Sequence, residues 1–323
     1  MTVTPGSQGV EHTMSAFRYK PSPYVPFRDM EALERCRRIR REEIEKHPNP
    51  DYRIRVVKDA DLEFIWVTDM FYRIKTAADA GEKLVLILPN PCPVYRHVAR
   101  LINAFRVNCA RLHVFAMDEY ANEDGEIAPE TWPQGFMHAL KGYFYYEIDL
   151  DLRPPEKQIV GPTDANVGAY SHMIADAGGA DQVYTGPGWT GHLAFIEPDA
   201  PEFAVPLEEW MQMGARIVTL SPFTLAQNSL HGSFGMSGDI AAVPPRAFTI
   251  GPADVIAAKN RMDLHGITVH GTTTSWQRMI TRLCLHGPVT PLLPTSLHQL
   301  LRTDVYVTEI AARDIAIDLD KGY

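Results

Sequence analysis

Short apolar runs alternate with helical segments along most of this chain, and this alternation constrains its fold most strongly. Leu84–Leu88 is a continuous apolar run, as expected for a strand buried on both faces of a sheet. Further strands are expected at Leu112–Ala116, Asp181–Thr185, Ile217–Leu220, Ala247–Ile250, Gly266–Val269 and Asp304–Val307. Such alternation predicts an α/β fold, a doubly wound and mostly parallel sheet with helices on both faces.

Segments with helical periodicity separate these strands. Helices are expected at Asp29–His47, Asp59–Ala80, Val94–Phe105, Gln134–Tyr146, Asn166–Asp176, Phe223–Leu230, Pro252–Ala258 and Trp276–Cys284. Residues 1–27 are rich in Pro, Ser and Gly and are expected to form an extended arm. The chain therefore divides into an N-terminal arm and helix, residues 1–55, and a single main α/β domain, residues 56–323.

The composition indicates which binding partners are unfavourable and which cellular compartment suits the chain. A length of 323 residues permits one large domain or two small ones, and the formal net charge is −9. An acidic chain without a Lys/Arg block is a poor candidate for binding nucleic acid or an anionic membrane. No run of 18 apolar residues is present, the N-terminus lacks the pattern of a signal peptide, and the four cysteines are unpatterned. These features predict a cytoplasmic protein without disulfide bonds or a local zinc motif.

Three loops follow predicted strands and are candidates for a common site. They are Pro89–Pro93, Met117–Tyr120 and Gly186–Pro198. Ligands of doubly wound sheets bind beyond the carboxyl ends of the strands, so the three loops are expected to converge on one crevice.

Asp118 and Glu119 are adjacent carboxylates that directly follow a buried strand. Mutual repulsion and partial desolvation raise a carboxyl pKa and make the group a better base near neutral pH. On spacing alone, the alternative of a loop carboxylate that caps the next helix or is simply solvated is favoured.

His192 follows three glycines, Gly186, Gly188 and Gly191, and precedes Glu197 by five residues. Glycines allow close backbone approach and can expose amide N–H groups, while a histidine exchanges protons near pH 7. Glu197 is placed to orient the ring and to stabilise its charged form. The alternative is a structural histidine in a glycine-rich turn. The glycine spacing also matches GxGxxG, but the residues after it are strand-like, which argues against a nucleotide site.

Two motifs in these loops resemble the glucosamine-6-phosphate deaminase/isomerase family of the 6-phosphogluconolactonase-like superfamily. They are Phe-x-Met-Asp-Glu-Tyr at 115–120 and Gly-x-Gly-x-x-Gly-His-x-Ala-Phe-x-Glu-Pro at 186–198. More diffuse similarity extends from about residue 60 to 312. The resemblance implies a Rossmann-like fold and an isomerisation of an amino sugar coupled to loss of ammonia.

The resemblance also implies catalytic roles and partners. Asp118 would abstract the proton on C2 of an open-chain hexosamine, His192 would open the sugar ring, and Glu197 would support His192. Glu119, Asn90, Thr190, Gly188 and Gly191 are the candidate substrate contacts. No metal or cofactor is implied. The partner would be a small sugar or amino sugar, and members of the family range from monomers to hexamers, so a homo-oligomer is compatible with the sequence.

The chain departs from the family pattern at three places, two of them at the expected phosphate site. Thr190 replaces an Asp two residues before the histidine. The loop after the first strand contains three prolines, which lack an N–H donor, and only Asn90 offers a good donor side chain. The family also binds the phosphate through an Arg and a Lys, and both are missing. Leu230 stands at the Arg position, and three threonines stand at the Lys position, residues 272–274. Arg278 or His270 could substitute from nearby. The substrate is therefore expected to lack the phosphate.

Two other functions remain open from the sequence. One is a catalytically impaired sugar-binding or regulatory protein of the same fold, which the loss of the Asp at Thr190 favours. The other is a 6-phosphogluconolactonase-like hydrolase, which shares the glycine–histidine region. Cys92 lies in the proline-rich loop, but the sequence supplies no base beside it, so a nucleophilic role is not favoured.

Overall fold

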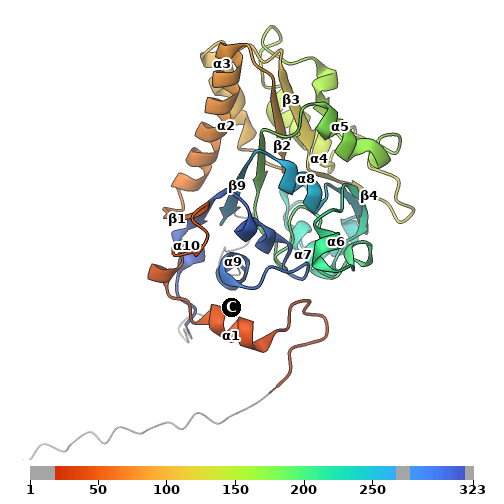
Figure 1. The fold of residues 1–323 in the computed structure, drawn as a ribbon. Helices are drawn as coiled ribbons and strands as arrows, with labels where there is room; N and C mark the ends of the chain where they lie inside the picture. The colour runs from red at the N-terminus through yellow and green to blue at the C-terminus, as the bar shows by residue number, and fades with distance from the viewer. Residues whose placement is uncertain (1–18, 267–276, 317–323) are drawn as a thin grey trace, which may run out of the picture.

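The computed structural model describes residues 19–266 and 277–316, and its centre is a seven-stranded sheet (Figure 1). The strand order is β1-β10-β9-β6-β2-β3-β5, and every neighbouring pair is parallel. The strands are β1 (Tyr52–Val57), β2 (Leu84–Leu88), β3 (Leu112–Ala116), β5 (Ile159–Val160), β6 (Gln182–Thr185), β9 (Asn260–His265) and β10 (Thr303–Thr308). The predicted mostly parallel α/β sheet is confirmed.

Helices cover both faces of this sheet. All five residues of β2 are buried. Alternate side chains pack into two hydrophobic clusters, one on each face of the sheet. Leu84, Leu86 and Leu88 pack with residues of α2 (Asp61–Ala80), α3 (Tyr95–Ala104) and α4 (Phe136–Leu140). Val85 and Ile87 pack with residues of α5 (Tyr170–Asp176) and α8 (Pro252–Ala257) on the opposite face. The continuous apolar run at this position is thus explained by a strand covered on both sides.

A second, antiparallel sheet of three strands adjoins the main one. Its order is β4 (Asp118–Ala121), β8 (Arg246–Thr249) and β7 (Arg216–Thr219). Met117 joins the two sheets, because its N–H donates to Leu88 and its carbonyl accepts from Ile250, both at 3.0 Å. The prediction of a loop at Met117–Tyr120 is therefore wrong, since most of this segment is a strand. Two acidic residues in four give little strand signal, and pairing with a distant segment supplies the structure.

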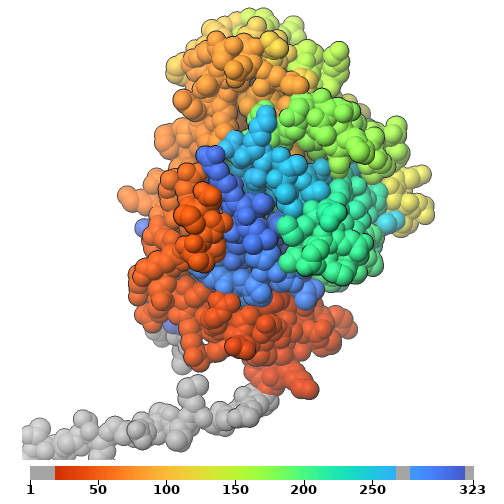
Figure 2. All heavy atoms as spheres, viewed as in Figure 1, coloured from red at the N-terminus to blue at the C-terminus, as the bar shows by residue number. Residues whose placement is uncertain are grey.

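The N-terminal region packs beside the C-terminal part of the chain. Helix α1 (Met30–Arg37) contacts α9 (Gln277–His286) through a cluster that includes Cys36 and Leu283, and it ends ten residues earlier than the predicted helix. Figure 2 shows the red and orange spheres of this region along the lower edge, against the blue C-terminal part. The expected division between residues 55 and 56 falls inside β1, which pairs with β10 over six residues.

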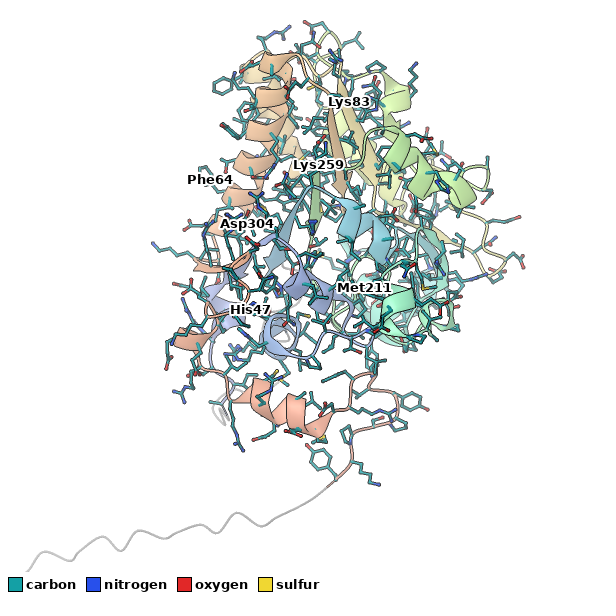
Figure 3. The ribbon with its side chains drawn as sticks, viewed as in Figure 1. His47, Phe64, Lys83, Met211, Lys259 and Asp304 are labelled. Atoms are coloured by element: carbon teal, nitrogen blue, oxygen red, sulfur yellow. The ribbon has the colours of Figure 1, made fainter. Side chains whose placement is uncertain are left out.

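The remaining helices include α6 (Leu207–Trp210), α7 (Pro222–Asn228) and α10 (Glu309–Ala312). Of the strand predicted at Gly266–Val269, residues 267–269 lie outside the described residues, and β9 ends at His265, directly before Gly266. None of the described helices is long and apolar enough to cross a membrane. Lys83 and Lys259, labelled in Figure 3, precede β2 and β9 in the upper part of the molecule, so these parallel strands start there and run away from it.

Candidate active site

A cavity with a volume of about 150 Å³ lies at the carboxyl ends of β2, β3, β6 and β9. This is about ten times the space that one water molecule needs, so a small ligand fits. The three predicted loops all contribute, and α7 and the first residue of α9 add side chains. The polar lining includes Asn90, Asp118, His192, Gln227, Asn228 and Gln277. The convergence expected from the sequence is thus found in the structure.

Strand register explains why two of these side chains line the same cavity. Leu88 in β2 pairs with Ala116 in β3. Asn90 and Asp118 each follow this pair by two residues, and both line the cavity. Neighbouring strands lie only about 4.8 Å apart, so the segments that carry Asn90 and Asp118 leave the sheet from adjacent strand ends.

Asp118 is a buried carboxylate that faces the cavity. Only 6% of the residue is exposed, and its Oδ1 has no hydrogen-bond partner among the described residues. Burial raises the pKa of Asp118 well above its ordinary value, and the neighbouring charge of Glu119 raises it further. A desolvated carboxylate with free lone pairs is suited to accept a proton from a ligand.

Glu119 has a different environment from its neighbour. Its Oε1 accepts hydrogen bonds from the backbone N–H groups of Tyr120 and Phe136, both at 2.9 Å, and its Oε2 accepts from Met137 at 2.7 Å. Burial raises the pKa of Glu119 to about 7, although these three donors oppose the rise. The carboxylate caps the first turn of α4, so the capping interpretation describes this member of the pair.

The imidazole of His192 lies against the backbone of Gly188. A Cβ at position 188 would come within 1.9 Å of His192 Nε2, so only glycine leaves room for the ring in this position. The Gly188 carbonyl accepts from Gly191 at 2.9 Å, and the Gly188 N–H donates to the His192 carbonyl at 3.2 Å. The glycine-rich turn therefore holds the histidine at the cavity wall.

Three side chains surround the other ring nitrogen, Nδ1. Thr224 Oγ1 lies at 3.0 Å, Thr190 Oγ1 at 3.3 Å and Glu197 Oε2 at 3.4 Å. Glu197 is buried, and its Oε1 accepts from the Ser221 N–H at 3.4 Å. A proton on Nδ1 directed at these oxygens leaves Nε2 as the atom that exchanges protons with a ligand.

The predicted substrate contacts separate into two groups. Asn90 and Gly188 line the cavity together with Asp118 and His192. Glu119, Thr190 and Gly191 are absent from the cavity wall formed by the described residues. Glu119 caps a helix, Thr190 contacts His192 from behind, and Gly191 has a φ of +78°, which favours glycine in this turn. These three residues therefore support the site without lining it.

Several lining residues were not identified as site residues from the sequence. Gln227 and Asn228 belong to α7; the Gln227 side chain accepts from the Trp189 N–H at 2.7 Å, and Asn228 donates to the Tyr120 hydroxyl at 3.0 Å. Phe136 and Phe195 form a stacked pair with ring centroids 5.8 Å apart. His231 also lines the cavity. Gln227 and Asn228 fall within the diffuse family similarity from about residue 60 to 312, which was the one signal available for them.

The loop after β2 does not offer the donors of an anion site. The first N–H groups of α3, at Tyr95, Arg96 and His97, donate to loop carbonyls at 3.2, 3.2 and 3.0 Å. A helix N-terminus binds an anion through such groups, and here they are already occupied. Burial also raises the pKa of the Cys92 thiol to about 12, so Cys92 is protonated at neutral pH.

Cationic side chains are missing from the described part of the cavity wall, which contains no Lys or Arg. The two nearby substitutes considered from the sequence do not fill this gap. Arg278 donates to the Ile310 carbonyl at 3.2 Å and does not line the cavity, and His270 lies outside the described residues. No group of three His, Cys, Asp or Glu side chains within residues 19–266 and 277–316 is arranged to hold a metal ion.

The doubly wound fold and the acid–base residues around its cavity are those of an α/β enzyme. The glucosamine-6-phosphate deaminase of Mannheimia succiniciproducens is 31% identical over 234 residues, which cover 70% of this chain and 77% of that protein. That of Porphyromonas gingivalis is 29% identical over 269 residues, covering 80% and 92%. The chain belongs to the glucosamine-6-phosphate deaminase family, as the sequence motifs indicated.

Solved structures show the same fold. A monomeric glucosamine-6-phosphate deaminase superposes with a TM-score of 0.65 at 20% identity, covering 80% of this chain and 98% of the other. The 6-phosphogluconolactonase of Leishmania guyanensis gives a TM-score of 0.56 at 13% identity, covering 82% and 98%. No family profile matches the chain.

Proposed function

We propose that this protein isomerises and deaminates a hexosamine that lacks a phosphate group. The observation that carries the proposal is the buried Asp118 carboxylate, which faces the same cavity as the supported ring of His192. Membership of the family supports the reaction type, and the composition of the cavity supports the change of substrate.

The proposed reaction begins when His192 transfers a proton between the ring oxygen and the hydroxyl on C1, which opens the sugar. Asp118 then takes the proton from C2, and the electron pair of the broken C–H bond forms a C1–C2 double bond while the π electrons of the C1 carbonyl move to its oxygen, which takes a proton from His192. Return of a proton to C1 gives an imine at C2. Water adds to this imine and ammonia leaves, so the products are a ketose and ammonia. Each proton transfer is general acid–base catalysis.

The electrostatics of the two carboxylates suit this division of roles. The raised pKa of Asp118 makes it a stronger base than an exposed aspartate. Glu197, behind His192, stabilises the imidazolium that forms while the ring holds an extra proton.

The change of substrate is supported by the cavity wall. A bound phosphate is usually held by several charge-assisted hydrogen bonds. The described wall has no Lys or Arg, three residues of the loop after β2 are prolines, and the N–H groups at the start of α3 are occupied. A neutral sugar end requires none of these donors.

The test is to measure ammonia and ketose production from glucosamine and from glucosamine 6-phosphate. Wild-type protein is expected to turn over the free amino sugar with the higher kcat/KM, and Asp118→Asn is expected to abolish turnover. Preference for the phosphorylated sugar would refute the proposed substrate. Binding of sugars without turnover would instead identify a sugar-binding protein, and hydrolysis of a sugar lactone would identify the lactonase alternative.

A further inference from the structure

The cavity wall presents acceptor atoms that have no hydrogen-bond partner within residues 19–266 and 277–316. Asn90 Oδ1, Asp118 Oδ1 and Gln277 Oε1 are buried, line the same cavity and lack a hydrogen-bond partner among the described residues. Buried polar atoms in native proteins are almost always paired, and an unpaired one is costly. All three atoms are oxygens, so the group that satisfies them must donate hydrogen bonds.

Asn90 provides the clearest of these acceptors because its amide is oriented. Its Nδ2 donates to the Leu88 carbonyl at 3.3 Å, which directs Oδ1 away from that carbonyl. An amide can otherwise rotate to present either its oxygen or its nitrogen, as Gln277 can. Asn90 and Asp118 follow the ends of two paired strands and line the same cavity, so this acceptor faces the cavity that the proposed base also faces.

The charge of the surroundings defines which ligand group fits at Asn90. A phosphate group offers only acceptor oxygens when fully ionised, and it would meet the oxygens of Asn90 and Asp118 with no Lys or Arg on the described wall to offset the repulsion. A hydroxyl or an ammonium group donates hydrogen bonds and would satisfy both oxygens.

We propose that Asn90 is a specificity-determining residue whose Oδ1 accepts a hydrogen bond from a hydroxyl or ammonium group of the substrate. Through this contact the loop after β2 selects a donor-bearing, unphosphorylated sugar. The inference rests on the proposed function, because it assumes that a sugar occupies the cavity beside Asp118.

The test uses an unreactive open-chain probe, 2-amino-2-deoxyglucitol, compared with glucitol and with the 6-phosphate of the amino alcohol. Calorimetry is applied to wild-type protein, Asn90→Ala, Asn90→Asp and Asn108→Ala. Asn108 is exposed in the loop before β3, at the opposite end of the sheet, and provides a control.

Wild-type protein is expected to bind the amino alcohol at least about tenfold more tightly than its 6-phosphate. Asn90→Ala should weaken amino alcohol binding about tenfold, the effect of one lost hydrogen bond to a polar or charged group, whereas Asn108→Ala should not change it. Asn90→Asp keeps an acceptor oxygen and should retain amino alcohol binding while weakening the phosphorylated probe further. A loss confined to the amino alcohol assigns the ammonium group, and an equal loss for glucitol assigns a hydroxyl.

Unchanged affinity in a folded Asn90→Ala variant would overturn the inference, as would tighter binding of the phosphorylated probe by wild-type protein or failure of both unphosphorylated probes to bind. Measuring ammonia release separates failure of this inference from failure of the proposed function. Asn90-dependent binding without ammonia release supports the inference alone, and ammonia release that does not depend on Asn90 supports the proposed function alone.

Discussion

The ring of His192 occupies the space that any side chain at position 188 would need, since a Cβ on Gly188 would lie 1.9 Å from Nε2. Gly188→Ala must therefore displace the imidazole from the cavity wall. A misplacement of about 1 Å in a catalytic group can lower the rate about 100-fold, so kcat/KM should fall by roughly this factor. The matched control is Gly142→Ala, because a Cβ there meets no atom within 4 Å. Equal activity of the two variants would show that the position of the His192 ring is unimportant.

Thr224 makes the shortest of the three contacts to His192 Nδ1, and we predict that it positions the ring. Thr224→Val keeps the shape but removes the hydroxyl at 3.0 Å, and kcat should fall about tenfold with little change in KM. The pH profile of kcat should also shift, because the group that faces Nδ1 changes. Thr224→Ser should restore most of the rate.

Thr190→Val serves as the comparison for this prediction. Its hydroxyl is farther from Nδ1, at 3.3 Å, and the same atom replacement should have a smaller effect. If Thr224→Val altered thermal stability but left both kcat and its pH profile unchanged, the role of Thr224 would be purely structural.

Glu119 is predicted to stabilise the fold as a helix cap. Glu119→Ala leaves the N–H groups of Tyr120, Phe136 and Met137 without their acceptor, which should lower the free energy of unfolding by about 1 to 3 kcal/mol. Glu119→Gln keeps one acceptor oxygen and should lose less. Chemical denaturation measures both values. A raised KM for the substrate at unchanged stability would restore Glu119 as a substrate contact.

The contrast between Asp118 and Glu119 shows how far the sequence could predict this site. The spacing indicated two carboxylates after a buried strand, and both are indeed buried. It could not show that one would face a cavity and the other a helix N-terminus, because β4 pairs with β8, a strand more than 120 residues away in the chain, and this pairing sets where each side chain points. The residues around Asp118 and Glu119 do not indicate which distant strand they pair with.

The central strands were predictable because apolar composition alone determines them, and β2 and β3 begin and end at the predicted residues. Strand β9 was not, because Asp263 and His265 are buried there as a pair 2.9 Å apart. Polar side chains that satisfy one another inside the protein remove the apolar pattern by which a buried strand is recognised. Gln227 and Asn228 were missed for a related reason, since their place at the cavity depends on how α7 packs.

Asp118 is predicted to lower the stability of the fold in exchange for its position at the cavity. Its pKa is raised on folding from an ordinary value of 3.8, so the folded state binds the proton more tightly than the unfolded chain. The free energy of unfolding therefore falls as the pH rises above 3.8, and the loss is larger at pH 7 than at pH 4. Asp118→Asn removes this ionisation while keeping the shape of the side chain.

Asp118→Asn should consequently raise the melting temperature at pH 7 by about 1 to 2 °C, equivalent to roughly 1 kcal/mol, and change it little at pH 4. Asp124→Asn, in an exposed turn close by, should change it little at either pH. Thermal unfolding at the two pH values measures both variants. A melting temperature that fell at pH 7 would show that the Asp118 carboxylate has a stabilising partner in the folded protein, and it could not then be the desolvated base of the reaction.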